Sequence, residues 1–282
     1  MREKIIVTLT TWSKRIGNIP TVLDTIYKQT LPPDKVVLNL AYGEFVPDEV
    51  QHYLHQHSVE VNRMKDTKVY KKLIPTLKKY PNGCIIPIDD DWLYPMGMIE
   101  ELMSMHKRFP RNPISGNKEV VCGIQCHCGC ASLTKAEYFG EYLNMIDDDV
   151  IANCPSDDMV YSYLSTLAGH PYYRTINSFF LNMQPFDAVE GYSESCQNDS
   201  VGKSFDYLRE RFGEINGQMS LYLPDTYMGE FMDDIITKSI RYYEAKKERE
   251  TEDRIYSTYS FRIGQTIVKP FRWMKNKFQN HQ

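Results

Sequence analysis

Three consecutive aspartates, residues 89–91, directly follow the apolar run 84–88, and this junction constrains the fold more than any other feature of the chain. The run is short and follows the turn formers Pro81-Asn82-Gly83, which is typical of a buried central strand. Ligands of open α/β sheets bind where such strands end. Clustered carboxylates repel one another unless a cation compensates them. With the aromatic segment 92–94 after it, the triplet favours a metal site over a solvated acidic turn.

Apolar periodicity predicts an alternation of strands and helices through the first half of the chain. Strands are expected at 4–10, 35–40, 60–64 and 84–88, and helices at 19–29, 47–57, 73–80 and 96–109. The second half mixes a strand region at 120–131 with helices at 157–168 and 201–212. This order predicts an α/β fold with a mostly parallel sheet flanked by helices.

Composition indicates a globular protein and gives no case for nucleic-acid binding. The 282 residues carry a formal net charge of -4, whereas nucleic-acid proteins normally show a basic surplus. The apolar stretch at 5–9 is too short for a secretory signal, and no window approaches the roughly 20 apolar residues that span a bilayer. A cytoplasmic location is therefore expected. We expect one α/β domain over residues 1–226 and a helical, basic and aromatic extension over 227–282.

The extension changes character after Asp253. Its six remaining lysines and arginines are accompanied by no acid and alternate with aromatic residues. This pattern suits an anionic membrane surface, which would make the protein peripheral at the inner membrane face. A terminal helix that docks on its own domain explains the same pattern, and the sequence leaves both interpretations open.

Seven cysteines, an odd number, favour reduced thiols over a disulfide framework. Cys122, Cys126, Cys128 and Cys130 cluster around His127, but they lack the paired Cys-x-x-Cys spacing of zinc sites. Small buried side chains in the core are the favoured interpretation.

Four segments, in order along the chain, carry a resemblance to a known family. They are 7–16, 29–36, 72–81 leading into 88–91, and 154–158. With these segments the chain resembles GT-A fold glycosyltransferases of the bacterial, family-two-like group that builds surface polysaccharides. The resemblance covers most of residues 1 to about 215 and leaves the extension outside.

The resemblance implies an inverting, metal-dependent transfer of a sugar from a nucleotide diphosphate sugar, such as a UDP-sugar, to a hydroxyl of a glycan or lipid-linked glycan. Mn²⁺ or Mg²⁺ would be the cofactor, because both prefer oxygen ligands and stabilise a departing diphosphate. By analogy with the family's Asp-x-Asp motif, Asp91 would bind the metal directly. Asp89 would contact the ribose or a metal-bound water, and Asp90 would belong to the same nucleotide site. Strand register decides which of the three faces the cation.

The resemblance also implies further nucleotide contacts. Thr8 and Thr10 would bond to the base edge and Arg15 would reach phosphate oxygens, although strand propensity alone accounts for the threonines. Asp66 and Lys72 match the family's base-contacting acid and its phosphate- or ribose-facing lysine. Taken in isolation, each is a surface charge.

Inversion requires a carboxylate that accepts the proton of the acceptor hydroxyl. Asp158, with Asp157 as its neighbour, is the candidate base, since both open a helix behind the N-cap residue Ser156. Acids at helix starts are also common without a catalytic role. A second triplet, 147–149, is interpreted as a solvated turn. Near the family's acceptor cavity, the stretch 123–130 keeps small residues but adds unusual thiols, which leaves acceptor specificity open.

Two rivals remain. A sugar-phosphate nucleotidyltransferase should carry a glycine-rich phosphate loop after its first strand, and residues 10–13 do not supply one. A non-catalytic sugar-binding or scaffold protein would keep the fold without the chemistry, and the presence of Asp91 and Asp158 argues against it.

Overall fold

The structure is a computed structural model, and it describes residues 3–116, 120–121, 124–125, 127, 129–175, 184–185 and 200–215. The expected extension at 227–282, its basic, aromatic tail and the domain boundary before it lie outside these residues. So do Cys122, Cys126 and Cys128 of the cysteine cluster.

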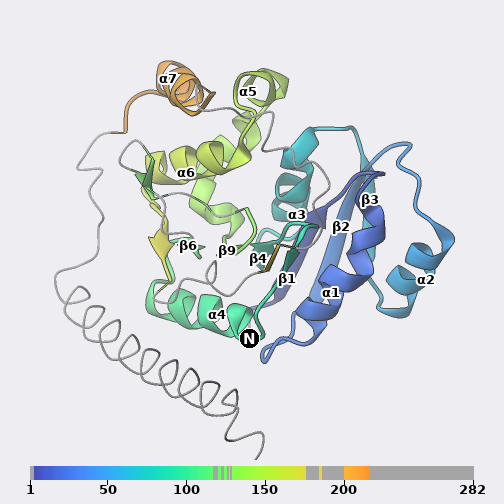
Figure 1. Ribbon diagram of the computed structural model, residues 1–282. Coiled ribbons are helices and arrows are strands. Elements are labelled where there is room, and N and C mark those ends of the chain that lie inside the picture. The colour runs from blue at the N-terminus through green and yellow to red at the C-terminus, as the bar shows by residue number, and fades with distance from the viewer. Residues whose placement is uncertain are drawn as a thin grey trace, which may run out of the picture. The chain divides into compact units, whose positions relative to one another are not determined.

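The core of the protein is a four-stranded parallel sheet in the order β3-β2-β1-β4 (Figure 1). The strands are β1 (Ile5–Thr10), β2 (Lys35–Ala41), β3 (Glu60–Met64) and β4 (Cys84–Pro87). Val7 in β1 pairs with Val36 on one side and Ile86 on the other. The first strand is therefore central, and the expected mostly parallel α/β sheet is confirmed.

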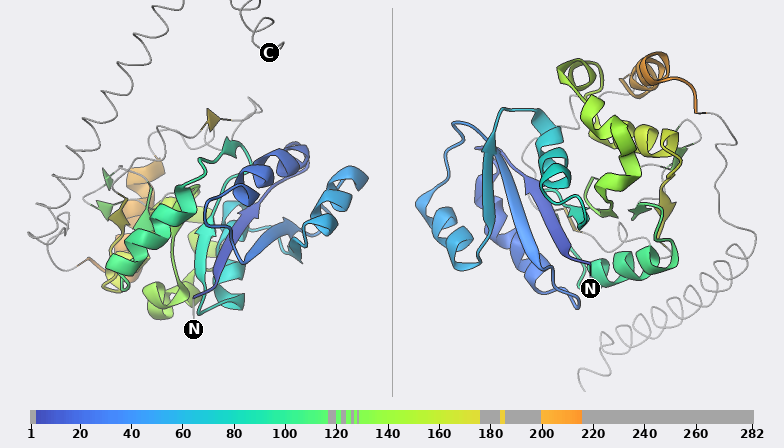
Figure 2. Two further views of the ribbon diagram at one scale, coloured as in Figure 1. Left: turned by 90° about the horizontal axis from the view of Figure 1, so that it is seen from below. Right: turned by 180° about the vertical axis from the view of Figure 1, so that it is seen from behind.

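Helices cover both faces of this sheet, as the views in Figure 2 show. The helices of the first half are η1 (Ile16–Asn18), α1 (Ile19–Tyr27), α2 (Asp48–Gln56), η2 (Lys68–Lys72), α3 (Ile74–Lys79) and α4 (Met98–Arg108). Those of the second half are η3 (Ala136–Met145), α5 (Asp148–Asn153), α6 (Asp157–Leu167) and α7 (Ser200–Phe212). None of the helices in the described ranges has the length and apolar character needed to cross a bilayer.

Short strands form three small additional sheets. They are β5 (Trp92–Leu93) with β11 (Gln184–Pro185), β7 (Val120–Val121) with β8 (Ile124–Gln125), and β6 (Ile114–Ser115) between β10 (Tyr173–Arg174) and β9 (Ser132–Leu133). Among the described residues of the strand region expected at 120–131, residues 120–121 and 124–125 are extended, and Gly129 and Cys130 lie in a turn. Cys130 is buried and forms no disulfide, in agreement with its expected place in the core.

Alternation along β1 determines which residues meet which helices. Ile6 belongs to a buried apolar cluster with Leu73 and Leu77 of the η2–α3 segment and with Val160 and Leu164 of α6. The neighbours on either side of Ile6 are also buried but point to the opposite face, since successive strand side chains alternate. Residue 8 therefore lies on the same face as Ile6, towards η2 and α6.

The second acidic triplet does not form the solvated turn expected from the sequence. Asp147 is the N-cap of α5, where its side chain accepts a hydrogen bond from the Val150 N–H at 3.1 Å. Arg211 of α7 binds Asp147 and Asp149 at 2.5 and 2.7 Å. The turn prediction was wrong because short acidic side chains stabilise helix N-termini as readily as they suit turns.

Glu60 on the edge strand β3 yields a prediction about stability. It binds Lys35 at 3.1 Å and Lys79 at 2.8 Å, and it accepts a hydrogen bond from the Tyr80 hydroxyl at 2.5 Å. Burial alone would raise the pKa of Glu60, but these partners outweigh it and lower that pKa to about 2. Since the pKa of an unfolded Glu is about 4.3, the stability contributed is complete above that pH and is lost as the pH falls towards 2.

We predict that Glu60→Gln lowers the free energy of unfolding by about 1–2 kcal/mol at pH 7. The difference from the parent protein should shrink below pH 4. Urea denaturation at pH 7 and pH 3 measures both values, with Glu49→Gln on the exposed surface of α2 as the control. An equal loss at the two pH values would show that the ion pairs are not its source.

Candidate active site

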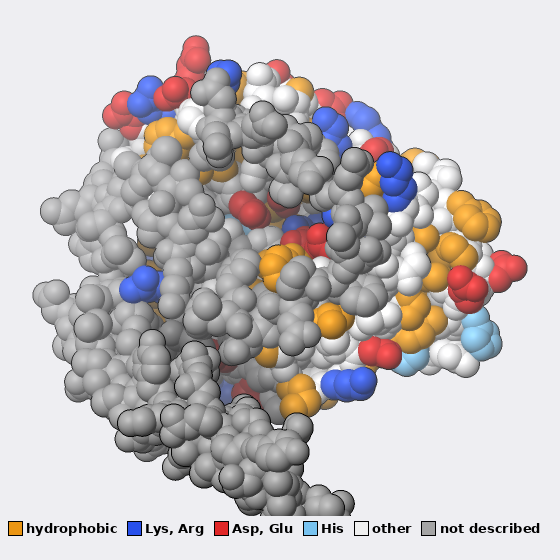
Figure 3. Space-filling view, in the orientation of Figure 1, with side chains coloured by type: hydrophobic (Ala, Val, Ile, Leu, Met, Phe, Trp, Pro, Cys, Tyr) orange, Lys and Arg blue, Asp and Glu red, His pale blue; other side chains and the backbone are white. Residues whose placement is uncertain are grey.

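Strand alternation separates the aspartates that follow β4. Ile85 lies on the same face as Ile6, its partner in the register, and the Ile88 N–H still donates to the Thr8 carbonyl at 2.9 Å. Continuing the alternation turns Asp89 towards η2 and α6 and turns Asp90 towards the loop after β1. In the space-filling view, acidic and basic side chains meet in a hollow near the middle of the face (Figure 3).

Asp90 is built into the protein rather than presented to a ligand. Its carboxylate accepts hydrogen bonds from the Thr11 hydroxyl at 2.5 Å and from Arg15 Nη1 at 3.0 Å. Burial raises the pKa of Asp90, while Thr11 and Arg15 oppose that rise. The middle aspartate therefore fastens the β1–α1 loop to the end of β4.

Asp89 and Asp91 are the members of the triplet that a ligand can reach. Their side chains are 33% and 27% exposed, against 8% for Asp90. Asp91 Oδ2 lies 2.9 Å from Arg15 Nη1, and Asp89 Oδ1 lies 2.8 Å from Lys72 Nζ. The Asp89 N–H donates to the Tyr94 hydroxyl at 2.8 Å, which holds the segment in place. Each accessible carboxylate is thus paired with an internal cation.

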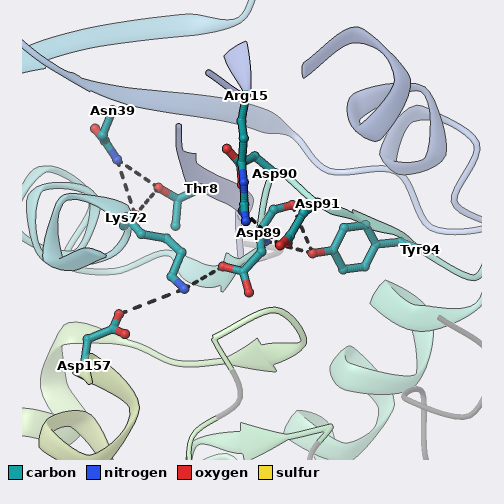
Figure 4. A network of polar contacts seen from close by, with 9 residues as sticks. All are labelled: Thr8, Arg15, Asn39, Lys72, Asp89, Asp90, Asp91, Tyr94 and Asp157. Atoms are coloured by element: carbon teal, nitrogen blue, oxygen red, sulfur yellow. Dashed lines mark hydrogen bonds and ion pairs between the residues drawn. The ribbon is translucent and has the colours of Figure 1, made fainter. Parts of the chain in front are cut away.

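Lys72 joins this triplet to α6 (Figure 4). Its side chain is only 6% exposed, and its ammonium nitrogen lies 2.8 Å from Asp89 Oδ1 and 4.0 Å from Asp157 Oδ2. Burial would lower the pKa of Lys72, but the charges of Asp89, Asp157 and Asp158 outweigh it and raise that pKa well above its usual value. The ammonium group is therefore charged at neutral pH.

Thr8 and Asp66, both expected at the nucleotide, make their described contacts away from the aspartate triplet. Thr8 is fully buried, and its hydroxyl donates to the Lys72 carbonyl at 2.6 Å, so it supports the backbone of the lysine. Asp66 is exposed in the loop after β3, where it pairs with Lys71 and accepts the Lys68 N–H at 2.9 Å. The described contacts connect neither residue directly to the aspartate triplet.

Thr10 ends β1 and lies at the carboxyl edge of the sheet. Its hydroxyl donates to the Asn39 carbonyl at 2.7 Å, and the residue is partly exposed. Arg15, expected at phosphate oxygens, is buried beside Asp90 and Asp91. The loop between them therefore brings one hydroxyl and one guanidinium group to the edge where Asp91 lies.

Asp157 and Asp158 open α6 as expected, although the Ser156 side chain at the N-cap makes no capping hydrogen bond. Asp157 is buried, and burial raises its pKa while the charge of Lys72 opposes the rise. Asp158 is partly exposed, which makes it the more accessible of the two acids. A Cβ atom at Gly129 would lie 3.0 Å from Asp158 Oδ1 and 2.7 Å from Lys72 Nζ. Only a glycine fits between these two groups without displacing one of them.

The loop that contains Gly129 is fastened to α6. The His127 N–H donates to Ser162 Oγ at 2.6 Å, and the Ser162 hydroxyl donates to the Asp158 carbonyl at 2.5 Å. The imidazole is fully buried beside Tyr172, and burial, aided by the charge of Lys72, lowers the pKa of His127 well below its usual value. The histidine is thus neutral and structural at this position.

The sequence assigned no individual role to four residues of the site: Thr11, Tyr94, His127 and Gly129. Thr11 lies within the motif segment 7–16 and Tyr94 follows the segment 88–91, and their polar side chains beside a predicted strand end were the available signal. Nothing in the sequence indicates what a Cβ at Gly129 would meet.

Whether this site can hold a divalent cation depends on its donor atoms. Asp89 and Asp91 offer oxygen ligands, which Mg²⁺ and Mn²⁺ prefer, and Mg²⁺ is commonly held by one or two carboxylates together with substrate phosphates. Among the described residues, three ligand atoms within 4.8 Å of one another occur at Glu3, Cys84 and His106. That group lies at the amino end of the strands, and Lys135 already binds Glu3 there at 3.0 Å. The donor set at Asp89 and Asp91 therefore fits a cation shared with a phosphorylated ligand.

Comparison with known proteins identifies the fold. A mannosyltransferase from Pyrobaculum calidifontis, solved in complex with GDP-Man and Mn²⁺, matches with a TM-score of 0.57 at 15% sequence identity, over 94% of this chain and 84% of that one. S. aureus TarS matches with a TM-score of 0.48 at 8% identity, over 83% of this chain and 43% of its own length. No family model and no curated protein matches the sequence. The chain has the α/β fold of GT-A glycosyltransferases, and at these identities the likeness establishes the fold alone.

The close approach at Gly129 generates a prediction. In Gly129→Ala the added methyl group would press on a buried, ion-paired ammonium and on a carboxylate. Both groups end flexible side chains that can shift, so we expect the free energy of unfolding to fall by about 1 kcal/mol, the low end of the usual cost of overpacking. Gly202→Ala is the matched control, because a Cβ there meets nothing within 4 Å and helix propensity favours alanine. Chemical denaturation measures both variants, and equal stability of the two would refute the close approach.

Proposed function

We propose that this protein is an inverting, metal-dependent glycosyltransferase. It transfers a sugar from a nucleotide diphosphate sugar, such as a UDP-sugar, to a hydroxyl of a glycan or lipid-linked glycan in cell-surface polysaccharide synthesis. The observation that carries the proposal is the position of Lys72, which contacts Asp89 at 2.8 Å and lies 4.0 Å from Asp157. The candidate metal-binding and base-bearing segments, far apart in sequence, therefore meet at one site. The shared fold with a mannosyltransferase that binds GDP-Man and Mn²⁺ supports the same activity.

Asp91 and Asp89 are the residues that would hold Mn²⁺ or Mg²⁺. The cation would neutralise the charge that develops on the diphosphate as its bond to the sugar breaks. Arg15 lies beside Asp91 and supplies a guanidinium group suited to a phosphate oxygen. Asp90 holds Arg15 in this position through the 3.0 Å contact.

On the nucleoside side, Thr10 at the end of β1 and Asp66 after β3 remain the proposed contacts to the base or ribose, both at the carboxyl edge of the sheet. Thr8 contributes indirectly, because its buried hydroxyl holds the Lys72 backbone. The donor would therefore lie along the strand ends from β3 to β4, with its diphosphate near Asp91.

Asp158 is the proposed catalytic base. As the acceptor oxygen attacks the anomeric carbon, its proton passes to the Asp158 carboxylate, and the bond to the diphosphate breaks on the opposite side of the sugar. Asp158 is partly exposed, whereas Asp157 is buried and close to Lys72. Asp157 is thus the neighbour that orients the lysine, and Asp158 is the group that an acceptor can reach.

The proposal predicts that substitutions at the metal-binding aspartates after β4 and at the base on α6 remove different properties of the enzyme. Asp91→Asn and Asp89→Asn should abolish Mn²⁺-dependent binding of the nucleotide sugar together with its hydrolysis. Asp158→Asn should retain donor binding but reduce sugar transfer at least about a hundredfold, since it removes the base alone. Asp148→Asn, an exposed acid at the start of α5, is the matched control and should leave both properties unchanged.

A thermal-shift screen of nucleotide sugars with Mn²⁺ identifies the donor for these assays. Release of pyrophosphate from a nucleoside triphosphate would instead reveal a nucleotidyltransferase. Sugar binding that survives all the substitutions, without turnover, would indicate a scaffold protein.

Association with an anionic membrane is proposed from the acid-free, aromatic tail beyond Asp253. Removing residues 254–282 should weaken binding to vesicles that contain anionic lipid and should leave binding to neutral vesicles unchanged. Sedimentation with the two kinds of vesicle measures the difference, and unchanged sedimentation with the anionic vesicles would remove this part of the proposal.

A further inference from the structure

We infer that Lys72 is an internal counter-ion that competes with the divalent cation for Asp89 and moves towards Asp157 when the cation binds. The inference rests on the proposed function, because it assumes that the cation binds at Asp89 and Asp91. It assigns Lys72 a positioning role that links metal binding to the acids of α6.

The charges around Lys72 require such a competition. Its buried ammonium group lies against the carboxylate that a cation would use, at 2.8 Å. A divalent cation at Asp89 would meet this positive charge at short range, where burial weakens screening by water. Asp157 offers a second, buried anionic partner at 4.0 Å. A small displacement of the ammonium group therefore exchanges one carboxylate for the other.

The surroundings confine this displacement to the end of the side chain. The Lys72 carbonyl accepts hydrogen bonds from the Thr8 hydroxyl at 2.6 Å and from Asn39 Nδ2 at 3.3 Å, so the backbone is held. A lysine stem is flexible and its ammonium group bonds in any direction. Gly129 lies directly beside the ammonium group, and because it has no Cβ it avoids a contact of 2.7 Å with Nζ. The lysine can thus turn towards α6 without a change of fold.

Because Lys72 moves from one carboxylate to the other, cation binding at Asp89 and the charge of Asp157 on α6 influence each other. A cation at Asp89 strengthens the attraction between Lys72 and Asp157, and the charge of Asp157 in turn draws the lysine away from the metal site. Asp157→Asn should therefore weaken metal binding. Part of this effect should disappear when Lys72 is absent, which a double-mutant cycle measures.

The test is the affinity for Mn²⁺ without nucleotide, measured at pH 8 by the electron paramagnetic resonance signal of free Mn²⁺. Lys72→Gln removes the competing charge and should bind Mn²⁺ about tenfold more tightly than the parent protein. Lys72→Arg keeps the charge and should not gain affinity. Lys71→Gln is the matched control, because this neighbouring lysine is also buried but pairs with Asp66, and its Mn²⁺ affinity should equal that of the parent.

A lysine that served only to stabilise the fold would give the opposite result. Unchanged or weaker Mn²⁺ binding by a folded Lys72→Gln variant overturns the inference. If that variant unfolds in the absence of metal, Mn²⁺ should restore its circular dichroism spectrum, because the cation takes over the neutralising charge, and failure to restore it also overturns the inference. Additivity of Lys72→Gln and Asp157→Asn would remove the proposed link to α6.

Mn²⁺ binding by Asp91→Asn distinguishes a failure of this inference from a failure of the proposed function. If Asp91→Asn leaves Mn²⁺ binding intact, the metal site itself is misplaced and the proposed function fails. If Asp91→Asn abolishes binding and Lys72→Gln does not tighten it, the metal site stands and only the counter-ion role fails.

Discussion

A buried ammonium group between carboxylates from two distant stretches of chain is the interaction on which the candidate site depends. Removing a lysine charge from water costs several kcal/mol, and the cost is offset only when opposite charges lie close by. Asp89 and Asp157 supply those charges to Lys72. The same lysine thereby holds the end of β4 next to the start of α6, and with them the two halves of the proposed chemistry.

Strand geometry explains why the acidic triplet serves three different purposes. Successive side chains at the end of β4 point to opposite faces, so Asp89 meets Lys72 while Asp90 meets Thr11 and Arg15. Asp91 then lies where Arg15 partly neutralises it. A single register thus produces one carboxylate that holds the loop and two that remain accessible, each beside an internal cation.

Much of the fold could be predicted from the sequence because its elements are strongly periodic. The expected strand at 60–64 agrees with β3, and the expected helix at 157–168 ends one residue from the end of α6. Predictions based on local chemistry were less reliable. Acidic residues at 147–149 suit a turn and a helix N-terminus equally, and their partner Arg211 comes from a later helix that local chemistry does not reveal.

The candidate site likewise contains residues that the sequence predicts and contacts that it does not. The aspartates after β4 and at the start of α6 follow from local sequence, but their partners do not. Thr8 is a plausible nucleotide contact in the sequence, yet its place on the inner face of β1 commits its hydroxyl to the Lys72 carbonyl. Gly129 is one glycine among 15 in the chain, and its importance appears only when Lys72 and Asp158 are placed around it.

The central claim is that a divalent cation binds at the carboxyl edge of the sheet, facing the acids of α6. Anomalous X-ray scattering from crystals grown with Mn²⁺ and a nucleoside diphosphate tests it most directly. We predict a manganese peak in coordination distance of Asp91 and Asp89, bridged to the diphosphate, with Arg15 beside the same phosphates. A peak at Glu3, Cys84 and His106, or a nucleotide bound away from Asp91, would contradict the account.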